Sequence, residues 1–167
     1  MNCFQELTAK GGTVSEMKYK DYYMKSLENA NQFQDFVCIN LIKNGIVLSN
    51  LSSRKYQFEM GENLQGFEIK HDHLFRKTGN LYIEIAEKSN PINENYITSG
   101  VHRIDNSWIY CIGDYISVFL IQKQVLKAIL NKGNYKKVEN QTKTSLGYLY
   151  PVEKAREYFT EIIFPIK

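Results

Sequence analysis

The stretch that decides the fold is Gly61–Lys88, GENLQGFEIKHDHLFRKTGNLYIEIAEK, because it places charged residues within two strand-like patterns. In the first pattern, the period of two turns Phe67 and Ile69 to one face of a strand. Glu68 and Lys70 then lie next to each other on the opposite face. The first strand therefore carries an acid and a base on the same side.

The second pattern is Leu81–Ile85, in which the apolar residues share one face while Tyr82 and Glu84 share the other. The nine residues His71–Gly79 are long enough to join the two strands as an antiparallel hairpin. We therefore expect Glu84 to lie on the strand adjacent to Glu68, with both carboxylates facing one cleft.

Two carboxylates beside a lysine suit a divalent metal ion. Mg²⁺ takes hard oxygen ligands from one or two carboxylates and completes its shell with water and substrate phosphate. A metal in this place polarises the phosphate and supplies hydroxide, so the pattern indicates phosphodiester hydrolysis with Mg²⁺ or Mn²⁺ as cofactor. Lys70 would orient the attacking water or stabilise the transition state, and in the metal-free protein it should pair with Glu68 or Glu84.

The rest of the chain favours an α/β domain with a mixed central sheet flanked by helices. We expect a loose lead-in over residues 1–15 and one domain over residues 16–167. Helical spacing is predicted over Glu16–Lys43, Lys123–Lys132 and Val152–Phe159. Strand-like segments are Ile46–Ser49, Tyr56–Met60, Gly66–His71, Leu81–Ala86, Trp108–Ile112 and Ser117–Gln122. A solvated basic loop is expected over Asn131–Thr144, and an apolar tail over Ile162–Ile166.

Composition narrows the class of protein. The chain has 167 residues and a formal net charge of +3, which permits a polyanionic partner without requiring one. It contains no apolar run long enough to cross a bilayer and no signal-like start, so we expect a cytoplasmic protein. Cys3, Cys38 and Cys111 indicate neither a disulfide framework nor a zinc site. The absence of glycine-rich phosphate loops argues against a nucleoside-triphosphate enzyme.

At this point the residues resemble a known family. A strand bearing Glu-x-Lys, here Glu68-Ile69-Lys70, with an acidic residue before it and a helix upstream, is similar to the PD-(D/E)XK nuclease superfamily of restriction enzymes, resolvases and phage exonucleases. The resemblance covers about Gln32–Ile129. The residues Thr78-Gly79-Asn80 before Glu84, then Ser99-Gly100 and Asp105–Tyr110, look similar to uncharacterised phage-type members. The resemblance to this superfamily implies a restriction-endonuclease-like fold and the activity of a metal-dependent DNA nuclease.

The motif fits the family pattern in either of two registers. In one, Glu68-Ile69-Lys70 is the acid-x-lysine motif, and the preceding metal ligand is Glu62 or Glu59. In the other, Glu68 takes the place of the first acid and Glu84 that of the second.

Alanine then stands where the second register needs lysine, so Lys70 or Lys88 substitutes for it. Glu68, Lys70 and Glu84 belong to both registers. Together with Glu62 they form the predicted catalytic set, in which the three glutamates are the predicted metal ligands.

Several other residues have a structural and a functional interpretation. His71, His73 and His102 match no zinc spacing and are expected to be surface or hydrogen-bonded residues. Asp72 is interpreted as a turn residue, with an accessory metal contact as the alternative. Glu28 and Asp35 are expected on a solvated helix face, although nucleases of this type often carry an extra acid on this helix.

Basic residues outside the acidic segment supply a candidate DNA contact. Phosphate contacts release condensed counterions, so such residues would give a salt-dependent affinity that is similar across sequences. The predicted set is Arg76, Lys77, Lys132, Lys136, Lys137 and Lys143.

Two other classes of protein stay open at the level of sequence. One is a catalytically silent module that keeps the nuclease fold and binds nucleic acid or a protein partner. The other is a structural component of a phage or conjugative element, which is favoured if no basic surface borders the acidic cluster. A homodimer would suit cleavage of both DNA strands, but the sequence shows no interface.

Overall fold

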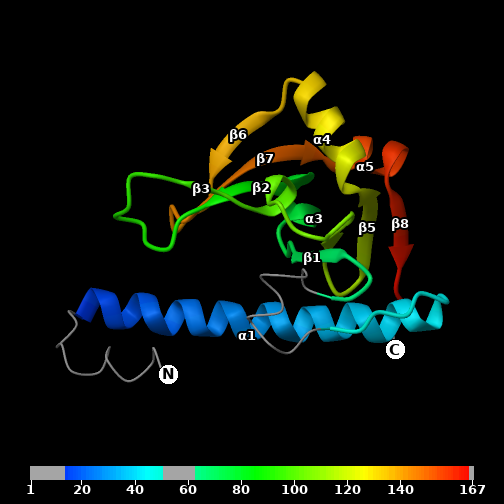
Figure 1. The fold of residues 1–167 in the computed structure, drawn as a ribbon, viewed down its shortest axis with the longest axis horizontal. Helices are drawn as coiled ribbons and strands as arrows, with labels where there is room; N and C mark the ends of the chain where they lie inside the picture. The colour runs from blue at the N-terminus through cyan, green and yellow to red at the C-terminus, as the bar shows by residue number, and fades with distance from the viewer. Residues whose placement is uncertain (1–13, 51–62, 166–167) are drawn as a thin grey trace. The chain divides into compact units, whose positions relative to one another are not determined.

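The computed structural model describes residues 14–50 and 63–165 (Figure 1). The chain divides into two compact units, Met1–Gln32 and Phe33–Lys167, and each is described by itself. Helix α1 spans Val14–Lys43, and its residues up to Gln32 are the described part of the first unit. None of the helices in these two ranges is both long and apolar enough to cross a membrane.

Helix α1 ends where the sequence predicts. The backbone N–H of Gly45 donates to the carbonyl of Ile42, and Gly45 has a φ of 79°, the left-handed conformation that glycine adopts without steric cost. The helix begins at Val14 rather than at about Glu16, so the last two residues of the expected lead-in are helical.

The second unit alternates strands and short helices (Figure 1). Its strands are β1 (Phe67–His71), β2 (Asn80–Glu87), β3 (Ile97–Thr98), β4 (Ile109–Gly113), β5 (Ser117–Gln122), β6 (Lys136–Glu139), β7 (Ser145–Pro151) and β8 (Thr160–Ile163). Its further helices are α3 (Phe75–Thr78), the 3-10 helix η1 (Gly100–His102), α4 (Lys123–Lys132) and α5 (Val152–Tyr158).

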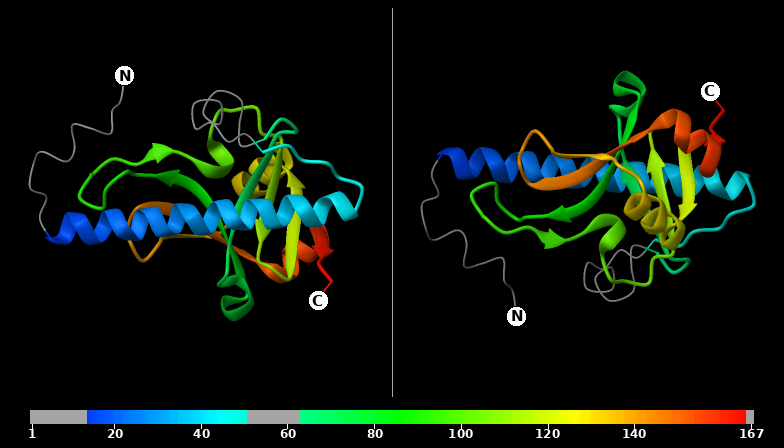
Figure 2. Two further views of the ribbon diagram at one scale, coloured as in Figure 1. Left: turned by 90° about the horizontal axis from the view of Figure 1, so that it is seen from below. Right: turned by 90° about the horizontal axis from the view of Figure 1, so that it is seen from above.

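The strands form two four-stranded sheets rather than the single mixed sheet expected from the sequence. The first sheet has the order β1-β4-β5-β8 and is mixed, because β1 runs parallel to β4 while the other pairs are antiparallel. The second has the order β3-β2-β7-β6 and is antiparallel throughout. Figure 2 shows β4 and β5 side by side in both views, with β8 next to β5. The α/β class is confirmed, whereas the arrangement in one sheet is wrong.

The predicted antiparallel hairpin between the two acidic strands is also wrong. Strand β1 pairs with β4, and β2 pairs with β3 and β7, so Glu68 and Glu84 belong to different sheets. The segment expected as a plain connection contains α3, which ends at Gly79 with a φ of 71°. This helix turn redirects the chain from one sheet to the other.

Several local predictions need correction as well. Residues Ile46–Ser49 form no strand, and Tyr56–Met60 lies outside the described residues. The expected basic loop Asn131–Thr144 contains β6, whose polar sequence suits the edge of a sheet. The apolar tail overlaps β8, and the strand β7 has no counterpart among the predictions.

Two apolar clusters lie on the two faces of the first sheet. Alternation along β4 turns Cys111 toward one cluster, while Tyr110 and Ile112 face the other. The cluster that contains Cys111 also includes Phe33, Val37, Cys38 and Leu41 of α1, together with Phe67, Ile69, Val118 and Phe164. The cluster that contains Tyr110 and Ile112 lies between the two sheets. It also includes Leu81, Ile83, Ile85, Phe119, Ile121, Leu126, Leu130 and Tyr150. Residues on β1 that face away from α1 therefore point into the space between the two sheets.

Candidate active site

Strand β1 places an acid in the protein interior. Phe67 and Ile69 pack into the cluster that contains the α1 residues, so Glu68 and Lys70 face the second sheet. The parallel pairing puts Glu68 opposite Tyr110 of β4. The side chain of Glu68 is fully buried, and a charge in such a position needs partners of opposite charge.

Two lysines supply those partners. The Lys123 ammonium lies 2.8 Å from Oε2 of Glu68, and the Lys70 ammonium lies 3.3 Å from Oε1. Lys123 is the first residue of α4 and is itself 3% exposed. Burial alone raises the pKa of the Glu68 carboxyl, but the charges of Lys70 and Lys123 outweigh this effect and lower the pKa. Glu68 is therefore ionised.

Lys123 also contacts a third acid, Asp105. The Lys123 ammonium lies 3.1 Å from Oδ1 of Asp105 and donates to Oγ of Ser107 at 2.7 Å. Arg103 binds the other oxygen of Asp105 at 2.6 Å. Burial opposes ionisation of Asp105, but hydrogen bonds from Ser107, Arg103 and Lys123 lower its pKa to about 2.

Lys70 joins the two sheets. Its ammonium lies 3.3 Å from Glu68 and 3.7 Å from Oε1 of Glu84 on β2. Glu84 accepts hydrogen bonds from the hydroxyl groups of Ser99 at 2.9 Å and Ser145 at 2.8 Å. The predicted pairing of Lys70 with the carboxylates is confirmed, and so is the convergence of Glu68 and Glu84 on one place.

The backbone around Glu84 holds its carboxylate in position. The pairing of β2 with β7 shifts by one residue between Glu84 and Ala86, a bulge of the kind that re-aims a side chain. Gly100 approaches closely, because a Cβ there would lie 2.2 Å from the carbonyl oxygen of Glu84, and its φ is 54°. The Ser99-Gly100 pair therefore fits against Glu84 only with glycine in the second place.

We call Glu68, Lys70, Glu84, Asp105 and Lys123 the carboxylate–lysine cluster. Three carboxylates and two ammonium groups meet in it. The side chains of Lys70 and Glu84 are 27% and 19% exposed, whereas those of the other three are nearly inaccessible. Lys70 and Glu84 therefore form the solvent-accessible side of the cluster.

Tyr110 lines the base of this cluster. It is fully buried, and burial, reinforced by the charges of Glu68 and Glu84, raises its pKa well above the ordinary value. The phenol therefore stays neutral next to the carboxylates.

The cluster meets part of the requirement for Mg²⁺. A cationic group already lies between Glu68 and Glu84, and these two carboxylates are the number that Mg²⁺ commonly takes from a protein. Within residues 14–50 and 63–165, however, no three His, Cys, Asp or Glu side chains are placed to share a metal ion. Glu62 and Glu59, the proposed further ligands, lie outside the described residues.

Asp72, which the sequence offered as a turn residue or an accessory metal contact, has structural partners. Asp72 accepts hydrogen bonds from the backbone N–H groups of Leu74, Phe75 and Tyr82, which confirms its turn role. His71 was expected to be a surface or hydrogen-bonded residue, but it is half-buried and stacks on Phe33 with ring centroids 4.4 Å apart. Its buried Nε2 makes no hydrogen bond among the described residues, so this expectation is wrong.

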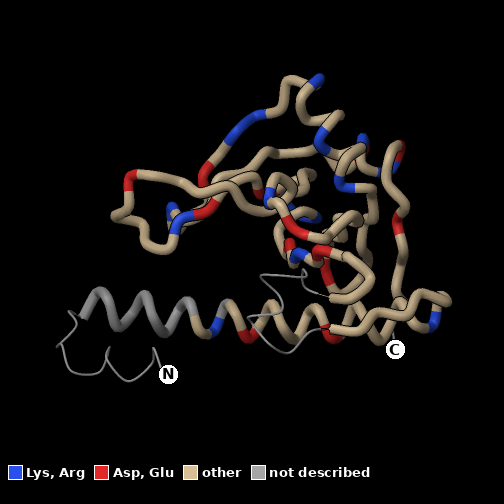
Figure 3. Tube along the Cα trace, in the orientation of Figure 1, with Lys and Arg blue, Asp and Glu red and all other residues tan. Residues whose placement is uncertain are grey.

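The predicted DNA-contacting residues do not share one environment. Arg76 lies in α3 and binds Asp114 through two hydrogen bonds, and Lys77 is exposed beside it. The others are exposed: Lys132 at the end of α4, Lys136 and Lys137 on β6, and Lys143 before β7. Figure 3 shows basic residues along α4 and β6.

The histidine of η1, His102, lies within the electrostatic influence of lysines from α4 and β6. Burial lowers the pKa of His102, and the charges of Lys127, Lys123 and Lys137 lower it further, so these lysines lie around it. Ser99, which binds Glu84, precedes η1 directly. Through η1, the electrostatic influence of Lys137 on β6 therefore reaches the residue range next to Ser99.

Sequence reasoning missed Lys123 and gave no role to Asp105. One signal for Lys123 was available. A lysine at the first position of a helix opposes the helix dipole, so its presence there indicates a nearby carboxylate. Asp105 carried no comparable signal, because strands β4 and β5 separate it from Lys123 in the sequence.

Comparison with known proteins adds no identification. No protein family, curated protein or solved structure matches this chain.

Proposed function

We propose that this protein is a metal-dependent nuclease of restriction-endonuclease-like type that hydrolyses phosphodiester bonds in DNA. The observation that carries the proposal is the position of Lys70, whose ammonium lies between the carboxylates of Glu68 and Glu84 at a partly exposed site. An acid and a lysine two residues apart on one strand, with a second acid opposite, is the arrangement that the family resemblance implies.

In this proposal Glu68 and Glu84, with Glu62, would hold Mg²⁺ or Mn²⁺. The bound ion would supply charge neutralisation for the phosphate and a hydroxide nucleophile. Lys123 keeps Glu68 ionised in the interior, and Ser99 and Ser145 orient Glu84. Lys70, released from its two carboxylates, would reach the attacking water or a phosphate oxygen and stabilise the negative charge of the transition state.

The test is cleavage of plasmid and single-stranded DNA in Mg²⁺ or Mn²⁺, with EDTA as the blank. Lys70→Met should lower the cleavage rate by about 10²-fold or more, which corresponds to roughly 2.7 kcal/mol of lost transition-state stabilisation. Glu84→Gln should abolish metal-dependent cleavage while the protein remains folded, because its side chain is partly exposed. Metal binding should be lost in Glu84→Gln and retained in Lys70→Met.

Lys88→Met is the matched control, because Lys88 donates to the carbonyl of Asn93 and stands over the ring of Tyr96, outside the cluster. It should cleave at the unmodified rate. An inactive Lys88→Met beside a fully active Lys70→Met would show that the family's lysine lies at the end of the Glu84 strand instead.

A second candidate is a catalytically silent module that binds DNA. The surroundings of Glu68 favour it, because both oxygens of this carboxylate already lie against lysine ammonium groups, which a metal ion would have to displace. DNA binding without cleavage in either metal would support this alternative. The affinity should then fall, and its salt dependence flatten, when Lys132, Lys136, Lys137 and Lys143 are neutralised together with Arg76 and Lys77.

A further inference from the structure

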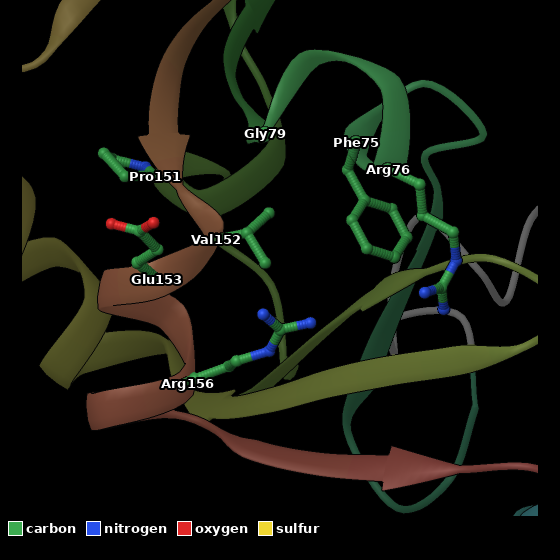
Figure 4. Close-up of a pocket in the computed structure, with 7 residues that line it drawn as sticks. All are labelled: Phe75, Arg76, Gly79, Pro151, Val152, Glu153 and Arg156. Atoms are coloured by element: carbon green, nitrogen blue, oxygen red, sulfur yellow. The ribbon is translucent and has the colours of Figure 1, made fainter.

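A second site lies in a cavity that shares no residue with the carboxylate–lysine cluster. The cavity has a volume of about 460 Å³, within the roughly 300 to 1,000 Å³ typical of small-molecule sites. Its walls come from α3, from the end of β7 and from α5 (Figure 4). Two arginines from separate segments, Arg76 and Arg156, line it together.

Each guanidinium group is paired with a carboxylate, Arg76 with Asp114 and Arg156 with Glu161. Arg76 donates from Nε to Asp114 at 2.6 Å and from Nη2 to Ser117 at 2.8 Å. Arg156 donates from Nε to Glu161 at 3.3 Å, and the Ser117 hydroxyl donates to the same carboxylate at 3.0 Å. The two arginines are therefore the ends of one hydrogen-bonded chain, which limits their freedom before any ligand arrives.

The orientation of Arg156 leaves donors for a ligand. Its hydrogen bond to Glu161 starts at Nε, and Figure 4 shows the Nη end of the group pointing into the cavity toward Val152 and Phe75. A guanidinium carries five N–H donors, and the hydrogen bond to Glu161 uses the one on Nε, so the four on the Nη atoms lie at the end that points into the cavity. Planar guanidinium groups of this kind match the oxygens of a phosphate.

The remaining walls are mixed in character. Phe75 and Val152 are apolar, and the Arg76 guanidinium stands 4.7 Å from the centroid of the Phe75 ring. Glu153 also lines the cavity, and its carboxylate can accept hydrogen bonds but repels an anion placed against it. The cavity therefore suits a molecule with a phosphate at one end and an organic group bearing hydroxyl or amino donors at the other.

We propose that this cavity binds a phosphate monoester, with the Nη donors of Arg156 on the phosphate, the charge of Arg76 adding to the attraction, and Glu153 accepting from the attached organic group. Two sources carry this chemistry: a free mononucleotide and the 5′-phosphate end of a nucleic-acid strand. The site does not rest on the proposed nuclease activity, because binding at the arginines needs neither metal nor cleavage.

The test is direct binding in EDTA, measured by calorimetry for small molecules and by fluorescence anisotropy for oligonucleotides. The probes are adenosine 5′-monophosphate against adenosine, and a single-stranded oligodeoxynucleotide with and without a 5′-phosphate. Arg156→Gln should weaken binding of the phosphorylated probe about tenfold or more, because charge-assisted hydrogen bonds are lost. With inorganic phosphate as a further probe, Glu153→Gln should bind phosphate more tightly and prefer adenosine 5′-monophosphate over it less, because the variant neither repels the anion nor accepts from the organic group as a carboxylate does.

Lys154→Gln is the matched control. This variant removes a positive charge from the same helix as Arg156→Gln, but Lys154 stands over the Tyr135 ring rather than in the cavity. The affinity of Lys154→Gln for the phosphorylated probes should therefore change less than twofold. Preference for the mononucleotide or for the 5′-phosphorylated strand identifies the source, and either result supports the site. Equal binding of phosphorylated and unphosphorylated probes, or equal losses in Arg156→Gln and Lys154→Gln, would overturn it.

Discussion

Two networks of charged side chains in the second unit use similar components under different conditions. The carboxylate–lysine cluster places Glu68, Asp105 and Lys123 at 3% exposure or less. The arginine network, formed by Arg76, Asp114, Ser117, Glu161 and Arg156, leaves its two arginines 38% and 56% exposed. In the first network each charge depends on the others for solvation, whereas in the second water shares that role. The same ion-pair chemistry therefore fixes the interior in one place and leaves donors for a ligand in the other.

The largest effect should follow from removing the buried cation. Lys123→Met leaves Glu68 and Asp105 in the interior without their shared partner, and the free energy of unfolding should fall by about 3 to 5 kcal/mol. Urea unfolding at pH 7 measures this loss. Lys132→Met, at the exposed end of the same helix, should change stability by less than about 0.5 kcal/mol.

A combined variant sharpens this prediction. Adding Glu68→Gln to Lys123→Met removes one uncompensated charge, so it should recover part of the lost stability. Additive losses in the double variant would mean that Lys123 and Glu68 are not energetically coupled and that the comparison between the two networks fails.

A smaller effect is expected from the pH dependence of Asp105. Its pKa is about 2 in the folded protein, against about 3.9 in an unfolded chain, so its ionised form favours the folded state. That contribution, on the order of 2 kcal/mol, is complete above about pH 5 and is largely lost as the pH falls to about 2. Asp105→Asn should therefore be less stable than the unmodified protein at pH 7, and the two should converge near pH 2.

Unfolding by urea at several pH values between 2 and 7 tests this. The pKa of Asp114, in the arginine network, is also lowered: burial opposes ionisation, and Arg76 outweighs it. Asp114→Asn should lose stability in the same direction but by less, because water competes for its more exposed partner. A pH-independent loss in Asp105→Asn would exclude the ionised carboxylate as its cause.

The smallest effect belongs to Arg156. With its side chain 56% exposed, Arg156→Gln should lower the free energy of unfolding by no more than about 1 kcal/mol. Thermal unfolding next to the Lys154→Gln control measures the difference. A loss comparable to that of Lys123→Met would make Arg156 a structural residue and remove the contrast between the two networks.

Local patterns determined much of the secondary structure. The period of two in Phe67–Lys70 placed Glu68 and Lys70 on one face of a strand, and the structure has them there. The predicted bounds of β5 and α4 agree with the structure, as does the end of α1 at Lys43. These features follow from the alternation or spacing of neighbouring residues, which a sequence displays directly.

The partners of those faces were decided only by the tertiary structure. The sequence predicted that Glu68 and Glu84 converge, but through a hairpin, whereas β1 pairs with β4 and Lys70 reaches Glu84 from the other sheet. Lys123 and Asp105 enter the cluster from distant positions that no local period connects. Strand pairing and the packing of two sheets depend on contacts far apart in the chain, so the sequence determined which side of each strand carries charge, and the fold determined which charges meet.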